Sequence, residues 1–429
     1  MGNTESIHQL DNGLRIVSRY MPDADSVTVQ FFIGAGGRYE DMTREYGVSH
    51  FLEHLLFKGS QKYPTPKLIS EMLDGVGGYS NAYTTPELTS FFAKVPKQHF
   101  ELAVDILSDI VTAPLFQEAE IDRERGVILE EMNLYRDDPA QHVFDYVNEL
   151  MWPHDPLRGN ILGTPELIRS LPREIIKNYH SSLYTMDNMV IAVAGNILPD
   201  QIQKVLQERL GGMKNTHQRE IIKSAGPIEQ NISRIVHQPT NQAHLVLAGR
   251  ALPRLHPDEA ALRVLTALLG GGLSSRLYVK VRENKGLAYS IFMSTSSFSD
   301  TGSWEIYAGA TNERLEEAIT AILQELEVVR SKPIFEEELS RVQQQITGRI
   351  IMGLETNGAV ADRIGSELLL SGQVRSLDTI LGEINAVTID DVMRVAQRYL
   401  DPSGIRLALI APQTTAKVAD IERLFTNNE

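Results

Sequence analysis

The chain of 429 residues contains no cysteine. Disulfides, cysteine-based metal sites and a catalytic thiol are therefore excluded, and any metal must be held by His, Asp or Glu. The chain also lacks the run of about 18 apolar residues that a membrane-spanning helix requires. Residues 1–6 show no basic and apolar segments of a secretory signal, and no arginine-rich presequence. We therefore expect a cytoplasmic protein that does not enter membranes.

Positive charge is in deficit, because 41 Lys and Arg residues face 56 Asp and Glu residues, for a formal net charge of -15. This balance disfavours nucleic acid and anionic membranes as partners. Acidic residues lining a cavity would favour basic, extended peptides. The plainer interpretation is an acidic surface in water, which is typical of charge runs. Hydrophobic residues make up 42% of the chain, enough for a large core.

The motif with the clearest chemistry is HFLEH, which places His50, Glu53 and His54 within five residues. On a helix, His54 lies about 40° from His50, and Glu53 about 60° to the other side. Two imidazoles on adjacent turns can bind one metal ion, and a nearby carboxylate can take a proton from metal-bound water. The order H-x-x-E-H is that of the inverted zinc-peptidase motif.

A catalytic zinc ion usually has a third protein ligand. The helix predicted over residues 116–135 offers Glu124 and Glu131, which lie within about 20° of each other on one face. Acidic residues near a helix N-terminus are more often solvated, and a lone histidine on an apolar face more often packs in a core. Burying three polar groups on one helix face is costly unless something binds them, which favours a metal site.

The two halves of the chain repeat one pattern of strands and helices. Strands predicted over residues 27–33 and 190–194 are matched by 243–249 and 405–410, and a last helix is predicted over 416–425. We therefore predict two homologous α/β domains of about 210 residues from an internal duplication. Their expected ranges are residues 1–212 and 234–429, joined by a polar linker over 213–233.

The metal residues occur once in this repeat. Where the first half has its histidines, the second half has ALLGG at residues 267–271. We therefore expect one metal ion per chain.

The chain resembles the insulinase/pitrilysin metallopeptidases, in particular mitochondrial processing peptidase and its small prokaryotic relatives. The spacing between His54 and Glu131 matches that family. The resemblance extends over nearly the whole chain and rests on four segments: HFLEH at 50–54, GYSNAYT at 78–84, ERGVILEE at 124–131 and VRENKGLAY at 281–289.

This resemblance implies a role for each residue of the first half. His50, His54 and Glu131 would bind Zn²⁺, and Glu53 would be the general base on zinc-bound water. Glu124 would orient a ligand or assist catalysis.

The resemblance also implies how substrate is bound. Asn81 and Ala82 would lie on an edge strand that pairs with an extended peptide. Arg282 and Tyr289 would contact the substrate and stabilise the oxyanion. Judged from the second half alone, a surface ion pair for Arg282 and a core position for Tyr289 are the simpler interpretation.

The implied fold class is α+β, with each domain a mainly antiparallel sheet with helices, together forming a bowl-shaped half-shell. The implied activity is that of a zinc-dependent endopeptidase for extended peptides or presequence-like segments. The implied assembly is a homodimer that encloses an acidic chamber. Two alternatives stay open: a non-catalytic scaffold or core subunit of a larger complex with this fold, and a module that binds peptides without cutting them.

Overall fold

The computed structural model describes residues 5–213, 217, 220, 221 and 233–412. Most of the predicted linker, and the helix predicted over 416–425, lie outside these residues.

The chain forms two compact units that are not continuous in sequence. The first unit comprises residues 1–133, 159–222 and 351–376, and the second comprises 134–158, 223–350 and 377–429. Each unit therefore includes a segment from the other half of the chain. The ranges 1–212 and 234–429 stay a prediction about the duplication, since the compact units follow packing rather than chain order.

A six-stranded sheet forms the centre of the first unit. Its order is β1-β2-β6-β3-β5-β4, and β2 pairs with β6 in parallel while all other pairs are antiparallel. The strands are β1 (Ser6–Gln9), β2 (Arg15–Tyr20), β3 (Ser26–Ile33), β4 (Tyr79–Thr84), β5 (Thr89–Pro96) and β6 (Met189–Gly195). The placement of β4 at one edge leaves one side of that strand without a neighbouring strand in the part of the chain that the structure describes.

The sheet of the second unit repeats this arrangement with five strands. Its order is β7-β11-β8-β10-β9, and β7 and β11 form its one parallel pair. The strands are β7 (Ser233–His237), β8 (Ala243–Ala251), β9 (Ala288–Ser297), β10 (Gly302–Ala310) and β11 (Arg406–Ala411). Strand order and direction match β2-β6-β3-β5-β4 of the first unit, so the predicted α+β class with two related, mainly antiparallel sheets is confirmed.

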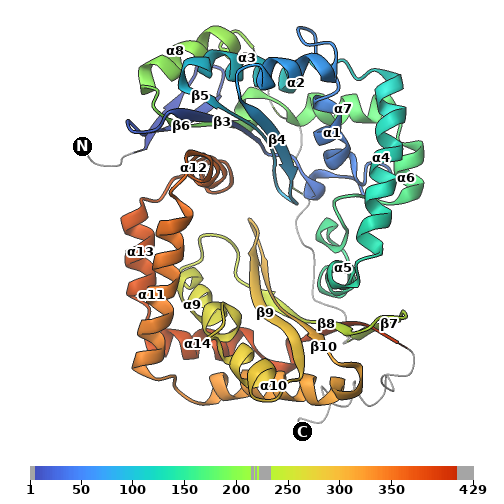
Figure 1. The fold of residues 1–429 in the computed structure, drawn as a ribbon, viewed down its shortest axis with the longest axis vertical. Helices are drawn as coiled ribbons and strands as arrows, with labels where there is room; N and C mark the ends of the chain where they lie inside the picture. The colour runs from blue at the N-terminus through green and yellow to red at the C-terminus, as the bar shows by residue number, and fades with distance from the viewer. Residues whose placement is uncertain (1–4, 214–216, 218–219, 222–232, 413–429) are drawn as a thin grey trace. The chain divides into compact units, whose positions relative to one another are not determined.

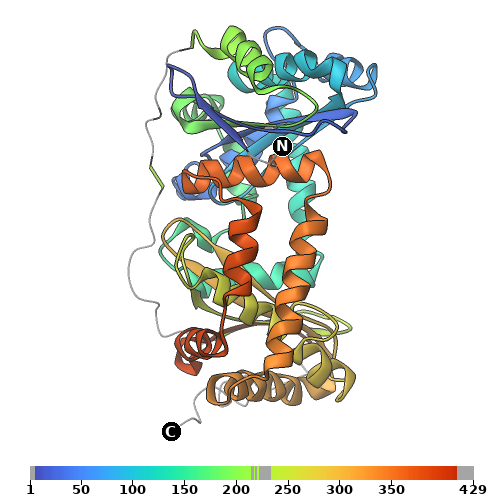
Figure 2. The ribbon, with the colours of Figure 1, turned by 90° about the vertical axis from the view of Figure 1, so that its left-hand side faces the viewer.

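One face of the first sheet is covered by a helix from late in the chain. Helix α12 (Asn357–Ser371) packs its residues Val360 and Ile364 against β2, β3 and β6, where Phe32 is part of the same buried cluster. Figures 1 and 2 show this orange-red helix beside the blue and green strands. The approach requires glycine, because a Cβ at Gly365 would lie 2.1 Å from the Phe32 ring.

The second sheet shows the reverse exchange. Helix α5 (Pro139–Met151), from the first half of the sequence, packs on β8 and β11. Alternate side chains of β8 face opposite ways: Val246 and Ala248 lie in the cluster with α5, whereas Leu245 and Leu247 lie in the larger core with α9 and α10. Both faces of this central strand are therefore buried.

The remaining helices include the two expected in the first half, at HFLEH and over residues 116–135, which are confirmed as α1 and α4. Those of the first unit are α1 (Val48–Leu56), α2 (Pro66–Asp74), α3 (Phe100–Thr112), α4 (Glu118–Arg136, which runs on to the second unit), α6 (Pro165–Ser170), α7 (Arg173–Leu183) and α8 (Pro199–Leu210). Those of the second unit are α9 (Glu259–Gly270), α10 (Leu315–Ser331), α11 (Glu336–Gly353), α13 (Leu377–Asn385) and α14 (Ile389–Tyr399).

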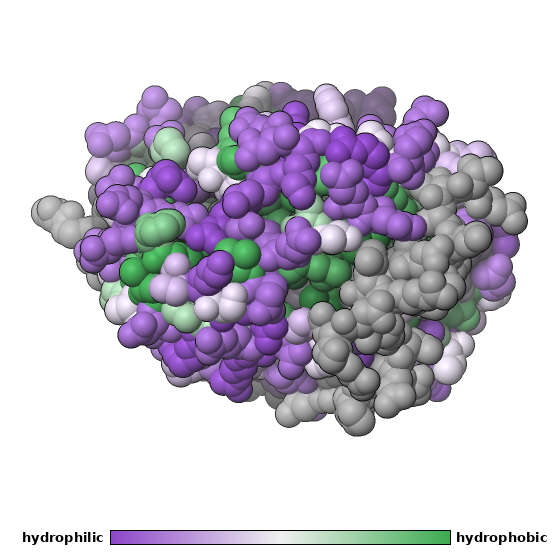
Figure 3. All heavy atoms as spheres, turned by 90° about the horizontal axis from the view of Figure 1, so that it is seen from below, coloured by the Kyte–Doolittle hydropathy of each residue, from purple (hydrophilic) through white to green (hydrophobic). Residues whose placement is uncertain are grey.

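None of the helices among the described residues is long and apolar enough to cross a membrane. On the face in Figure 3, purple hydrophilic side chains predominate, with green hydrophobic side chains between them.

Candidate metal centre

Helix α1 presents the histidines because its other residues anchor it in the core. Val48, Phe51, Leu52, Leu55 and Leu56 are all buried. The helix begins after Gly47, whose φ of 92° is in the left-handed region. A Cβ at Gly47 would lie 2.7 Å from the carbonyl oxygen of Leu162, so this start of the helix requires glycine.

A buried carboxylate caps this helix. Glu40 accepts hydrogen bonds from the backbone N–H groups of Gly47 and Ser49, each at 2.8 Å, and from the Ser49 hydroxyl. The cap satisfies two of the N–H groups that a helix start leaves free. Burial raises the pKa of Glu40 to about 7, although these three hydrogen bonds act in the opposite direction. Because it accepts all three bonds, Glu40 fixes the position of the turn that carries His50.

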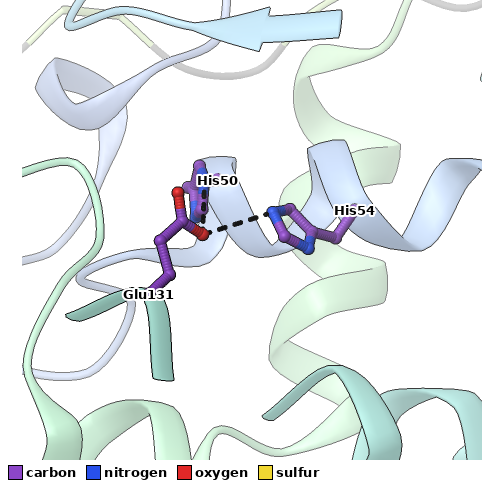
Figure 4. Close-up of side chains that lie close together, drawn as sticks. All are labelled: His50, His54 and Glu131. Atoms are coloured by element: carbon purple, nitrogen blue, oxygen red, sulfur yellow. Dashed lines mark ion pairs between the residues drawn. The ribbon is translucent and has the colours of Figure 1, made fainter. Parts of the chain in front are cut away.

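Three side chains converge at the end of this arrangement (Figure 4). The Nε2 atoms of His50 and His54 lie 3.8 and 3.7 Å from the same oxygen of Glu131, which α4 carries. These distances exceed a hydrogen bond and are close to the separation of about 3.4 Å expected for two ligands bound some 2.1 Å from one tetrahedral ion. The potential ligand atoms all lie within 4.8 Å of one another.

The chemistry of the three donors fits zinc. Two imidazole nitrogens and one carboxylate oxygen form a common ligand set of catalytic zinc sites, with a further position left for water. Burial, together with the neighbouring His54, lowers the pKa of His50 to about 3. His50 is thus neutral at neutral pH, so its nitrogen lone pair is available to a metal ion.

Glu124 determines how the His54 ring is oriented. Its Oε2 lies 3.0 Å from Nδ1 of His54, and its Oε1 lies 2.9 Å from Nζ of Lys58. Because Nδ1 then carries the proton, Nε2 of His54 presents its lone pair toward Glu131. The Nδ1 atom of His50, in contrast, is buried without a hydrogen-bond partner among the described residues.

Glu53 lies beside this group and is held by a strand. The hydroxyl of Thr84, the last residue of β4, donates a 2.6 Å hydrogen bond to Oε2 of Glu53. Burial raises the pKa of Glu53, while the Thr84 hydrogen bond acts in the opposite direction. The result is a carboxylate in a fixed position with increased basicity.

The residues expected to bind substrate in the first half lie on the same strand. Asn81 and Ala82 are in β4, which pairs only with β5 among the strands of the described residues. The Asn81 side chain is exposed. Strand β4 thus has a free edge, and its last residue contacts Glu53.

Arg282 and Tyr289 lie in the second unit, where irregular backbone brings them together. Arg282 is on a π-helical turn, Tyr278–Glu283, and its guanidinium lies 5.3 Å from the Tyr289 ring and 4.7 Å from the Tyr278 ring. Tyr289 is the extra residue of a bulge on edge strand β9, because Gly309 pairs with Ser290 and Ala310 with Ala288. The Tyr289 side chain is 73% exposed, so the core position considered from the sequence is wrong.

Sequence reasoning missed three residues of this site. Lys58 follows His54 by four residues, so helical spacing alone was a usable signal for it. Thr84 and Glu40 reach α1 from a strand and a loop, and no local pattern marks such contacts.

Two histidines one turn apart, a converging carboxylate and a second carboxylate held beside them define a candidate metallopeptidase centre. Residues 15–165 match the family model of insulinase (peptidase family M16), and residues 170–346 match that of the peptidase M16 inactive domain. The chain belongs to the insulinase (M16) family of peptidases. The match of the second half to the inactive domain agrees with the absence of the HFLEH motif there.

Relatives of known name cover nearly the whole chain. An uncharacterized zinc protease of Streptomyces coelicolor is 35% identical over 91% of this chain and 86% of its own length. One of Bacillus subtilis is 35% identical over 94% of this chain and 97% of its own. A probable mitochondrial-processing peptidase subunit beta of Arabidopsis thaliana is 30% identical over 94% and 77%.

Solved structures support the fold. The crystal structure of a protease from Helicobacter pylori matches with a TM-score of 0.86 at 23% identity, over 96% of this chain and all of that one. That of a peptidase M16 inactive domain from Pseudomonas fluorescens matches with a TM-score of 0.89 at 17% identity, over 96% and 99%.

Proposed function

We propose that this M16 family member is a zinc-dependent endopeptidase that hydrolyses extended peptides. The observation that carries the proposal is the convergence of His50, His54 and Glu131 on one point, with Glu53 fixed beside them. The relatives named as zinc proteases support the choice of metal. The single group of candidate ligands among the described residues supports one ion per chain. Bound there, zinc would lower the pKa of a water molecule and polarise the substrate carbonyl.

Glu53 acts as the general base in this proposal. Its carboxylate removes a proton from the attacking water and passes it to the leaving amine, a role that contributes about 10²–10⁴-fold to the rate. Its raised pKa favours this use, because a more basic carboxylate accepts a proton more readily. Glu124 assists by orienting His54 through Nδ1.

Substrate recognition uses backbone pairing. A peptide bound along Asn81 and Ala82 would add a strand to the free edge of β4. The net charge of -15 favours basic substrates, including presequence-like segments. Arg282 and Tyr289 would bind the substrate and donate to the carbonyl oxygen as negative charge develops on it. The short distance between the Arg282 guanidinium and the Tyr289 ring, and the exposure of Tyr289, support a joint role of these two residues.

The direct test is a cleavage assay on an unstructured basic peptide, with products identified by mass spectrometry. An endopeptidase gives internal cleavage, and removal of metal abolishes it. Peptide binding without products would instead support the peptide-binding module. Protein that neither binds zinc nor regains cleavage when zinc is added would support the scaffold.

Replacing Thr84 by Val tests the link between β4 and the base. Valine keeps the shape but removes the hydrogen bond to Glu53. Because a hydrogen bond to a charged group contributes about 1.5–3 kcal/mol, we expect kcat to fall about tenfold or more. Thr84→Ser, which keeps a hydroxyl, should retain most of the activity. Equal kcat values for the Val variant and the parent protein would rule out this role.

We further propose a homodimer that encloses the sites in an acidic chamber and excludes folded proteins, in a cytoplasmic location. The family resemblance supports the homodimer and the chamber. No helix among the described residues is long and apolar enough to cross a membrane, which is compatible with the proposed location. Sedimentation at working concentration should give a dimer, and a fully active monomer would refute this part. Cell fractionation tests the location.

A further inference from the structure

We infer that Lys58 is a positioning residue of the metal centre, which acts through Glu124 on the ligand His54. This inference rests on the proposed zinc site, but it concerns a residue outside the ligand set and outside the substrate contacts. The ammonium group of Lys58 would hold the Glu124 carboxylate against His54.

Lys58 is placed for this by the end of α1. Its backbone N–H donates to the carbonyl oxygen of Leu55 at 2.9 Å, so the last turn continues past Leu56. Being four residues after His54, Lys58 extends from the same side of that turn. One carboxylate thus bridges two groups of the same helix: Glu124 Oε1 lies 2.9 Å from Nζ of Lys58, and Oε2 lies 3.0 Å from Nδ1 of His54.

Glu124 needs this partner because it is nearly buried. Its side chain is 3% exposed, and a carboxylate removed from water is destabilised unless it is paired and hydrogen-bonded. The neighbouring arginines of α4 do not serve it. Arg123 binds Glu120, and Arg125 donates to the backbone oxygens of Ile168 and Leu171. Among the described residues, Lys58 is the one lysine or arginine paired with Glu124.

Without Lys58, the buried carboxylate would keep a single partner and lose its fixed position. His54 would then lose the contact that keeps its proton on Nδ1 and its Nε2 toward Glu131. Loss of such supporting contacts typically weakens metal binding about 10–100-fold. Removing a positive charge near a cation acts in the opposite direction. A double-mutant cycle with Glu124 separates the two effects.

The experiment measures the zinc dissociation constant of the purified full chain by competition with a chelator. The variants are K58M, K58R, E124Q and the double variant K58M/E124Q, with circular dichroism to establish that each is folded. K67M is the matched control, because Lys67 is 82% exposed and pairs with Glu71 on α2.

We expect K58M to weaken zinc binding about tenfold or more. K58R, which keeps the charge, and K67M should bind zinc like the parent protein. In the E124Q background, K58M should cause no further loss. Zinc binding by K58M as tight as in the parent, or an equal loss in the E124Q background, would overturn the inference. A parent protein that does not bind zinc would instead refute the proposed function.

Discussion

Replacing Glu53 by Gln should abolish most peptide cleavage while leaving zinc bound. Glutamine has nearly the same shape and can still accept the hydrogen bond from Thr84, but it cannot take a proton. Since general-base catalysis contributes about 10²–10⁴-fold, kcat should fall by that factor. The measurements are kcat on a peptide substrate and zinc content by metal analysis.

The matched control for this variant is Glu130→Gln. Glu130 is exposed on α4 directly before the proposed ligand Glu131, and no ion pair is found for it among the described residues. The Glu130→Gln variant loses the same charge close to the same centre. Because Glu130 has no role in the proposed mechanism, kcat of this variant should stay near that of the parent. A Glu53→Gln variant as active as the Glu130→Gln variant would show that Glu53 is not the base.

Replacing Tyr289 by Phe should give the second largest effect. The ring, and with it the contact with Arg282 at 5.3 Å, is kept, while the hydroxyl donor is lost. Removal of one oxyanion donor typically lowers kcat about 10²–10³-fold. Because the donor acts chiefly on the developing charge, KM should change much less than kcat.

The chain provides a close control in Tyr278, whose ring also lies beneath the Arg282 guanidinium, at 4.7 Å. Tyr278→Phe should keep nearly full activity, since we propose no hydrogen bond from Tyr278 to the substrate. Equal activity of the Tyr289 and Tyr278 variants would remove Tyr289 from the mechanism and leave it a partner of Arg282 alone.

Irregular backbone positions both Arg282 and Tyr289. Arg282 lies on a π-helical turn, and Tyr289 is the extra residue of a β-bulge. Such irregularities are frequent at functional sites because they redirect a side chain that regular structure would direct elsewhere. Exposure of the Tyr289 ring on an edge strand follows from this, and it makes the ring accessible to a ligand.

The grouping of the candidate ligands was largely predictable from the sequence because it depends on helical spacing. His50 and His54 are one turn apart, and Glu124 and Glu131 are two turns apart, so each pair must share a helix face. The apolar residues around them fix which face is buried. What spacing could not decide was the division of roles between Glu124 and Glu131. The structure places Glu131 against both histidines and Glu124 against His54 and Lys58.

Contacts between distant segments were not predictable in the same way. The family resemblance implied an edge strand at Asn81 and Ala82, and β4 does lie at the end of the strand order. The residues alone did not show this, because strand order depends on contacts that no local pattern contains. The positions of α5 and α12, each in the unit of the other half, were missed for the same reason. The Thr84–Glu53 hydrogen bond depends on how a strand end meets a helix.

The most direct test of the account is a zinc titration of metal-free protein, followed by cleavage of an unstructured basic peptide. Without metal we expect no cleavage, and with added zinc we expect activity to rise in proportion up to one ion per chain. The His54→Ala variant, which lacks one of the three proposed ligands, should show neither tight zinc binding nor cleavage. Full cleavage by metal-free protein, or by the His54→Ala variant, would contradict the account.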